Sequence, residues 1–316
     1  MMGSLVLLTA SYLAGEAFAQ QPSGPTSAST PLRMTQAELE LYERAPTLVD
    51  WTPKQLRLVP MLHKLRRAEN QVELVQILER VGKSTARLFS DFPNISCDEE
   101  VYSQSNARGP SWVGQGIHAN DLIRHFRYII IPKPVGDLPV FEEYRTERDG
   151  RPVEITKGAG LRVFDANFAG SWIYLSPSDQ PYNRFRYFGT QSVQKRECFV
   201  VGFAQDPRTA RILSAFRLVD PPVGLLVQGL AWIDKQSLQV LRIQTWLLAP
   251  RADIGLGAQN TLVNYFSVQP AGLDRSVSVP HDVTVTVFFR GTAVRNTHRY
   301  SKFQLFRVES AIKPAE

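Results

Sequence analysis

The chain of 316 residues has only two cysteines, Cys97 and Cys198, and lacks the motifs that mark common catalytic and metal sites. Its five histidines show no H-E-x-x-H spacing, which argues against a zinc site. No G-x-S-x-G motif and no Cys–His signature is present. No stretch beyond the N-terminus is apolar for long enough to form a transmembrane helix. We therefore expect a non-enzymatic protein with no cofactor, no metal and no membrane span.

The charge of the chain is not distinctive, because charged residues make up an ordinary 21% and the formal net charge is +6. A basic balance can attract anionic lipid or polyanionic wall polymers, or it can simply keep the chain soluble, which is the more general expectation. Residues 183–188, NRFRYF, interleave arginines with aromatics. A strand with alternating wet and buried faces explains that pattern, so we expect no nucleic-acid partner.

One acidic run, Asp98-Glu99-Glu100, is the strongest candidate for chemistry by carboxylates. On a strand, Asp98 and Glu100 share one face while Glu99 points to the other. Carboxylates that hold a metal or transfer a proton must converge on one point. We therefore interpret the run as the solvated end of a strand.

The N-terminus has the pattern of a secretory signal peptide over residues 1–19. A short apolar run beginning at Leu5 is followed by the cleavage pattern Ala17-Phe18-Ala19, so the mature chain is expected to begin at Gln20. The absence of a cysteine after this site argues against a lipid anchor. This predicts a periplasmic or otherwise exported protein, with a disordered linker at residues 20–34 and a flexible tail at residues 310–316.

In an oxidising compartment, two cysteines suggest one disulfide. We therefore predict a bond between Cys97 and Cys198; two small buried thiols are the alternative that the sequence leaves open.

Residues 35–93 are predicted to be helical. Three capping boxes mark helix starts: Thr35 with Glu38, Thr52 with Gln55, and Asn70 with Glu73. The third helix, residues 70–91, has apolar residues at three- and four-residue spacing, which predicts one buried stripe. Pro60 is expected to break the second helix.

From residue 94 to residue 309 the pattern predicts a curved antiparallel β domain. The predicted strands are Ile95–Gln104, Leu122–Ile131, Val140–Thr146, Ser171–Leu175, Lys195–Phe203, Ile212–Val219, Leu225–Ile233, Leu238–Leu248, Thr261–Val268, Asp282–Arg290 and His298–Val308. Two of them, Leu225–Ile233 and Leu238–Leu248, flank the polar segment Asp234-Lys235-Gln236-Ser237 and predict a central hairpin.

Several of these strands are apolar on both faces. In Lys195–Phe203, Phe199 and Val201 face one way while Cys198 and Val200 face the other. A sheet with one solvated face does not require this. The N-terminal helices can cover one face, so the other must meet a second layer or enclose an apolar hollow.

The hairpin also carries a resemblance to a known family. Residues 226–242, in the form L-x-Q-G-x-A-W-I-D-x-x-x-x-Q-V-x-R, resemble the penultimate hairpin of the periplasmic lipoprotein-carrier superfamily (LolA-like, outer-membrane lipoprotein-sorting proteins). Residues 187–205 and the closing HRYSKF at residues 298–303 are similar in style. The resemblance implies a sharply curved, incomplete barrel that is lidded by helices over a cavity for acyl chains.

The expected fold is therefore α+β, with N-terminal helices packed on a large, strongly curved antiparallel sheet in a LolA-like half-barrel. The expected function is binding of an apolar ligand, a lipid or a lipoprotein acyl chain, in a cavity between the sheet and the helices. The alternative is an envelope sensory or protein-interaction module on the same fold, with envelope proteins as partners. The candidate cavity lining is Trp172, Tyr174, Phe199, Val201, Trp232, Trp246, Val285 and Val287.

Overall fold

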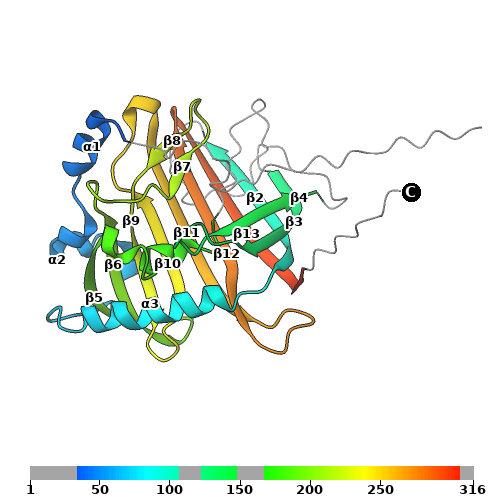
Figure 1. Cartoon of the computed structure of the whole chain (residues 1–316). Coiled ribbons are helices and arrows are strands. Elements are labelled where there is room, and N and C mark those ends of the chain that lie inside the picture. The colour runs from blue at the N-terminus through cyan, green and yellow to red at the C-terminus, as the bar shows by residue number, and fades with distance from the viewer. Residues whose placement is uncertain (1–33, 107–121, 148–166, 307–316) are drawn as a thin grey trace, which may run out of the picture.

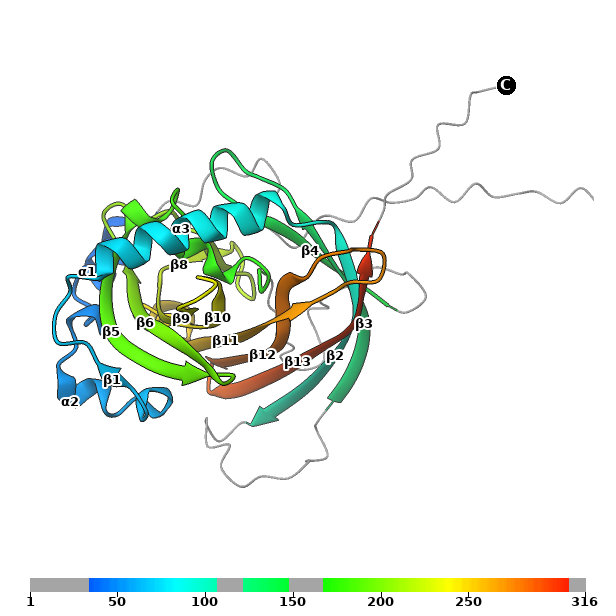
Figure 2. The same cartoon turned by 90° about the horizontal axis from the view of Figure 1, so that it is seen from below.

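The computed structural model describes residues 34–106, 122–147 and 167–306, and its largest element is one antiparallel sheet of eleven strands (Figure 1). The strands follow the order β1-β5-β6-β9-β10-β11-β12-β13-β2-β3-β4. Their bounds are β1 Arg66–Arg67, β2 Ile95–Asn106, β3 Leu122–Pro132, β4 Phe141–Thr146, β5 Asn183–Val193, β6 Arg196–Gln205, β9 Val227–Asp234, β10 Val240–Leu247, β11 Leu256–Val268, β12 Val277–Phe289 and β13 Thr292–Leu305. The sheet curls into an incomplete barrel (Figure 2). The predicted α+β fold with a large curved sheet is confirmed.

The central hairpin of β9 and β10 has the turn that its sequence predicts. The Asp234 carboxylate accepts hydrogen bonds from the backbone N–H (2.6 Å) and the hydroxyl (2.7 Å) of Ser237. Such bonds from an Asp side chain to the chain two or three residues on are typical of tight turns. The register places Ala231 opposite Ile243 and Trp232 opposite Arg242.

Three α-helices precede the long strands: α1 Gln36–Glu43, α2 Pro53–Leu56 and α3 Leu74–Ser90. The capping boxes predicted at Thr35 and Thr52 are present, each with both reciprocal hydrogen bonds. Short 3-10 helices follow α1 and α2, namely η1 Leu48–Asp50 and η2 Pro60–Leu62. The second helix already ends at Leu56, before the proline that was expected to break it, and Pro60 instead begins η2.

The third helix begins later than its sequence predicts. Its first residue is Leu74, and the N-cap residue Glu73 makes no capping bond through its side chain. The Asn70 side chain instead accepts a hydrogen bond from the Val72 backbone N–H (3.0 Å), which closes a turn before the helix. The capping box predicted at Asn70 is therefore wrong. The helix itself is confirmed, although Val75 of the predicted stripe faces solvent.

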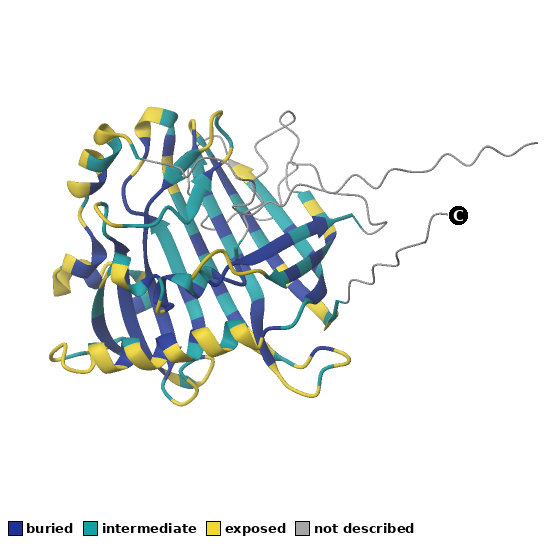
Figure 3. Ribbon diagram, viewed as in Figure 1, coloured by how far each residue is buried: buried dark blue, intermediate teal, exposed yellow. Residues whose placement is uncertain are grey.

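Both faces of the central strands are buried, as their sequences predict (Figure 3). Val200 and Trp232, which are paired across β6 and β9, belong to a core on the convex face. Val201 and Ala231, the next pair along, belong to a core on the concave face. The convex core also contains residues of α1, η1, α2 and η2, whereas the concave core contains residues of α3. Figure 2 shows α3 crossing the open side of the curl.

Two predicted strands are wrong. Ser171–Leu175 is a 3-10 helix, η3, and the segment around it lies inside the curl rather than in the sheet. From Ile212–Val219, only β7 (Ser214–Phe216) is extended, and it pairs with β8 (Val223–Leu225) in a separate two-stranded sheet. A further 3-10 helix, η4 (Gln180–Tyr182), precedes β5, and η5 (Ala252–Ile254) precedes β11.

The predicted disulfide is also wrong, since Cys97 and Cys198 are both free and buried. Cys97 lies on the concave side of β2, and Cys198 lies on the convex side of β6. Six strand spacings of about 4.8 Å separate β6 from β2, whereas a disulfide needs Cα atoms within about 7 Å. Burial raises the pKa of both thiols, that of Cys198 to about 11, so both are expected to be unreactive.

The predicted signal peptide, most of the predicted linker and the predicted tail lie outside the described residues. Within the described ranges, no helix has the length and apolar character needed to cross a bilayer.

Candidate functional site

The concave face of the sheet carries the larger of the two apolar cores formed by the described residues. Side chains of six neighbouring strands, β5, β6 and β9 to β12, form a single apolar lining on this side, because alternate residues of each strand point inward. The inward side chains include Tyr187, Phe199, Val201, Phe203, Val227, Ala231, Ile233, Val240, Ile243, Val263, Val283, Val285 and Val287.

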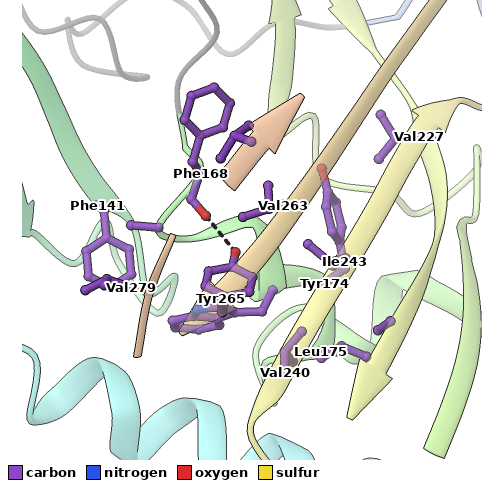
Figure 4. Packing of buried hydrophobic residues seen from close by; sticks show 14 of the residues in the cluster. Phe141, Phe168, Tyr174, Leu175, Val227, Val240, Ile243, Val263, Tyr265 and Val279 are labelled. Atoms are coloured by element: carbon purple, nitrogen blue, oxygen red, sulfur yellow. Dashed lines mark hydrogen bonds between the residues drawn. The ribbon is translucent and has the colours of Figure 1, made fainter. Parts of the chain in front are cut away.

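A stretch that we call the inner segment, residues 168–182, occupies the space in front of this lining. Its helix η3 buries Trp172 and Tyr174. The Tyr174 ring stacks on Phe203 of β6 with 4.9 Å between centroids. At its start, the carbonyl of Phe168 accepts a hydrogen bond from the hydroxyl of Tyr265 (2.6 Å; Figure 4). In the part of the chain that the structure describes, side chains of the inner segment therefore pack against the lining beneath the hairpin, and the apolar hollow expected there stays a prediction.

Helix α3 lies over the inner segment and is held to it in the middle. Gly82 faces the segment, and a Cβ added there would come within 3.0 Å of the Gln180 side chain. The Gln180 amide donates hydrogen bonds to the carbonyls of Leu78 (2.9 Å) and Leu175 (2.8 Å). Glycine at position 82 thus allows the close approach of α3 and the inner segment.

The two ends of α3 are attached to the sheet and to a loop. Before the helix, the Gln71 amide donates to the Tyr187 carbonyl (2.8 Å) and accepts from the Tyr187 N–H (2.8 Å), which extends the edge of β5. At the other end, Arg275, from the loop between β11 and β12, donates to the carbonyl of Asp91. Helix α3 therefore crosses the concave face and is held by hydrogen bonds near both of its ends.

Beyond the apolar lining, the inner side of β13, β2, β3 and β4 carries a buried charged cluster. Glu99 of β2 accepts two hydrogen bonds from Arg145 of β4 (2.6 and 2.9 Å). It also interacts with Nδ1 of His298 (2.8 Å) and accepts from the hydroxyl of Tyr300 (2.9 Å), both on β13. Burial by itself raises the pKa of Glu99, but the charge of Arg145 and the bond to His298 outweigh it and lower the pKa to about 2.

The cluster also positions the start of the inner segment. Glu143 of β4 accepts hydrogen bonds from the backbone N–H groups of Phe168 (3.1 Å) and Ala169 (2.8 Å). Burial raises the pKa of this carboxyl above its usual range. The Phe168 ring lies edge-on to His298 (5.0 Å between centroids) and under the guanidinium of Arg145 (5.7 Å).

This arrangement is suited to holding structure rather than to acid–base chemistry. With a pKa of about 2 and four hydrogen bonds, Glu99 stays ionised near neutral pH and is a poor proton donor or acceptor. Within the described ranges, no group of three or more His, Cys, Asp or Glu side chains forms a metal-binding arrangement.

The structure brings six of the eight predicted lining residues together on the concave side. These six are Trp172, Tyr174, Phe199, Val201, Val285 and Val287. The other two, Trp232 and Trp246, lie on the convex side. The indole N–H of Trp232 donates to the Gln191 side chain (3.1 Å) there, and Trp246 packs half-buried against the convex core. Ligand contact by any of the eight stays a prediction.

The buried position of Glu99 was missed from the sequence. We interpreted Asp98-Glu99-Glu100 as a solvated strand end, which fits Asp98, because its side chain is half-exposed and paired with Arg127 and Lys302. Glu99, however, is completely buried. A signal was present, since Glu99 shares its strand face with Cys97 and Val101, and a lone carboxylate between two apolar residues indicates a buried partner.

Comparison with known proteins finds similarity in structure alone. No family model and no curated protein matches the chain. A DUF1329 family protein from Desulfovibrio piger is 9% identical, with a TM-score of 0.39 over 74% of this chain and 95% of that one. A domain described as a candidate outer membrane lipoprotein-sorting protein, from Vibrio parahaemolyticus, is 11% identical, with a TM-score of 0.37 over 75% and 95%.

A LolA superfamily protein from Nitrosomonas europaea is 9% identical, with a TM-score of 0.37 over 73% of this chain and 94% of that one. LolA-like proteins are also the family that the hairpin pattern of residues 226–242 resembles. At these identities the likeness concerns the fold alone.

Proposed function

We propose that this chain is an exported, non-enzymatic protein that binds an apolar ligand, a lipid or a lipoprotein acyl chain, against the concave face. The observation that carries the proposal is the mismatch between that face and its cover. Six strands present a continuous apolar lining. Among the described residues, their cover consists of helix α3, the inner segment and the small β7–β8 sheet, none of which belongs to the eleven-stranded sheet.

The exchange of the inner segment for a ligand is close to balanced in energy. Burial of Trp172, Tyr174 and Leu175 stabilises the closed arrangement by about 2–3 kcal/mol each, or roughly 6–9 kcal/mol together. An acyl chain that buries about twelve methylene groups contributes about 10 kcal/mol on the same scale. A ligand of this length can therefore replace the three side chains without a large net cost.

A fluorescent fatty-acyl probe tests the proposal. Replacement of Tyr174 by Ala removes the ring that stacks on Phe203, so it weakens the inner segment as a competitor for the lining. We expect Tyr174→Ala to bind the probe about tenfold more tightly than the wild type, which corresponds to about 1.4 kcal/mol.

The matched control is Trp246→Ala, because Trp246 packs on the convex side. It should leave the probe affinity unchanged. If neither the wild type nor a folded Tyr174→Ala variant takes up the probe at micromolar concentrations, the proposal fails.

Export is part of this proposal and rests on the signal-peptide pattern at residues 1–19. N-terminal sequencing of protein from the envelope fraction should give Gln20 as the first residue. Cytosolic protein that retains Met1 would contradict export.

The packing of the inner segment on the concave face favours a second candidate function, a sensory or protein-interaction module of the envelope. Trp172 is buried against Phe141 (5.9 Å between ring centroids), so the inner segment itself occupies the concave face in this structure. Mass spectrometry of small molecules extracted from detergent-free protein separates the two functions. Co-purified lipid supports the carrier; one specific protein recovered without lipid supports the module.

A further inference from the structure

The segment that links α2 to the sheet, residues 53–67, concentrates positive charge. Its sequence PKQLRLVPMLHKLRR contains five Lys or Arg residues, one His and no Asp or Glu. All six of these basic side chains are exposed. The whole chain has 36 Lys and Arg against 30 Asp and Glu, so the excess is local. We call this stretch the basic segment.

The basic segment is held firmly on the convex side of the sheet. Leu56 and Leu62 are buried in the convex core. The Gln191 side chain of β5 donates a hydrogen bond to the Met61 carbonyl (2.8 Å). At the end of the segment, β1 pairs with β5. The exposed charges are therefore presented by an ordered backbone, which lowers the entropic cost of binding a partner.

Most of these charges are available to an external anion. Arg66 is paired with Glu197 of β6. Among the described residues, no carboxylate forms an ion pair with Lys54, Arg57 or Lys64. A fixed group of cations, most of which have no carboxylate partner, favours an anionic partner.

An apolar component accompanies the charge. Leu58 lies in the middle of the segment with 78% of its surface exposed. Neighbouring residues of the segment, three leucines with two arginines and a histidine, line a pocket of about 350 Å³. The pocket is lined by Leu56, Arg57, Leu62, His63, Leu65 and Arg67. Guanidinium groups bind phosphate oxygens in a bidentate manner, and exposed leucines insert into the boundary between headgroups and acyl chains.

We propose that the basic segment docks the protein on membrane surfaces that contain anionic phospholipids. Charge complementarity favours an anionic surface, and the exposed Leu58 favours a lipid surface over a soluble polyanion. Docking does not depend on whether the concave face holds a ligand. The basic segment and the cover of the concave face are nevertheless close along the chain. Gln71, which anchors α3 to β5, follows the segment by four residues.

Vesicle flotation with the full mature chain tests this proposal. Binding is expected to vesicles of phosphatidylglycerol and phosphatidylcholine, to fall as salt is raised, and to be absent with phosphatidylcholine alone. The double variant Arg57→Gln, Arg67→Gln should weaken binding about thirtyfold, from about fivefold for each charge. Leu58→Ser should weaken it about tenfold.

Two control variants remove the same kinds of side chain at exposed positions outside the basic segment. The double variant Arg290→Gln, Arg299→Gln removes the same charge at exposed positions of the β12–β13 hairpin. Ile123→Ser removes an apolar side chain, 54% exposed, on β3 near the opposite edge of the sheet. Both should keep binding within twofold of the wild type.

Three results would overturn the proposal. The first is a wild-type protein that binds no phosphatidylglycerol vesicles. The second is an equal loss in the Arg57/Arg67 and Arg290/Arg299 variants, which would indicate a bulk charge effect. The third is complete displacement by millimolar inorganic phosphate with no effect of Leu58→Ser, which would indicate a phosphate site. Failure of probe uptake on the concave face, with vesicle binding intact, would leave this proposal standing.

Discussion

The convex and concave faces of the central strands are both apolar, yet their covers are attached in different ways. The convex cover is bonded to the sheet at several points along its length. The Gln228 side chain of β9 accepts a hydrogen bond from the Leu48 N–H (2.7 Å), and Arg186 of β5 donates to the Trp51 carbonyl (2.6 Å). Farther along, Gln191 donates to Met61.

The concave cover is a layered arrangement. Helix α3 is anchored at its ends by Gln71 and Arg275, and its middle is bonded through Gln180 to the inner segment rather than to a strand. The inner segment is in turn positioned by Glu143, which lies beside the buried charged cluster. The covers of these two similar apolar faces therefore differ in where their polar contacts are placed.

The largest effect on the free energy of unfolding is expected in the buried charged cluster around Glu99. Glu99→Gln removes the charge that compensates Arg145, and breaking a buried pair in this way costs about 3–5 kcal/mol of unfolding free energy. The folded pKa of Glu99 is about 2, below its ordinary value of 4.5. The wild-type stabilisation is therefore complete above about pH 4.5 and is lost as the pH falls towards 2.

Urea unfolding at pH 7 and at pH 3 measures this effect. The control is Asp98→Asn, next along the strand but on the half-exposed outer face, which should cost less than about 1 kcal/mol. Equal losses for the two variants would show that the buried cluster is no more important than a surface ion pair.

A smaller change in the free energy of unfolding, a stabilisation, is expected for a substitution in the inner segment. Asp179 is fully buried, and burial raises its pKa to about 6 from 3.8. A carboxyl with a raised folded pKa contributes most stability at low pH and loses it as the pH rises through 6. Asp179→Asn should therefore stabilise the protein by about 2 kcal/mol at pH 7 and change little at pH 4.

Thermal or urea unfolding at the two pH values checks this prediction. Asp137→Asn is the comparison, because the hydrogen bond from Arg211 lowers the pKa of exposed Asp137. That variant should show no stabilisation at pH 7. A loss of stability in Asp179→Asn at pH 7 would mean that the ionised carboxylate stabilises the inner segment.

The smallest expected losses of stability come from substitutions that each remove one contact, one in the convex cover and one in the concave cover. Gln228→Ala leaves the buried N–H of Leu48 without its acceptor and should cost about 1–2 kcal/mol. Gln71→Ala removes the anchor of α3 at β5, which is less buried, and should cost under about 1 kcal/mol.

Hydrogen exchange distinguishes these variants by location. Gln228→Ala should speed exchange in residues 34–68, and Gln71→Ala should speed it in α3. In the wild type, slower hydrogen exchange in α3 than in residues 34–68 would contradict the proposal that a ligand can displace the cover of the concave face.

Local sequence signals predicted much of the fold, because they depend on a few neighbouring residues. The capping boxes at Thr35 and Thr52 form from residues three positions apart. Alternation along β12 places Val283, Val285 and Val287 on one face, and all three are buried together on the concave side. The turn at Asp234 is equally local.

The candidate site was less accessible to the same reasoning. Ser171–Leu175 is rich in residues that favour strands, yet it forms a 3-10 helix because it packs inside the curl, where no strand edge is offered to it. Glu99 was expected to be exposed because its partners, Arg145 and His298, are 46 and 199 residues away in the chain.

What the sequence by itself determined is the class of structure: helices first, then a large antiparallel sheet with two buried faces around a central hairpin. Alternation shows that Trp232 and Ala231 face opposite ways, but it cannot say which face is concave. Only the tertiary structure decided that Trp232 is convex, that the two cysteines are six strands apart, and that residues of the inner segment pack inside the curl. The physical reason is that curvature and long-range register depend on contacts between residues far apart in the chain, which no local pattern encodes.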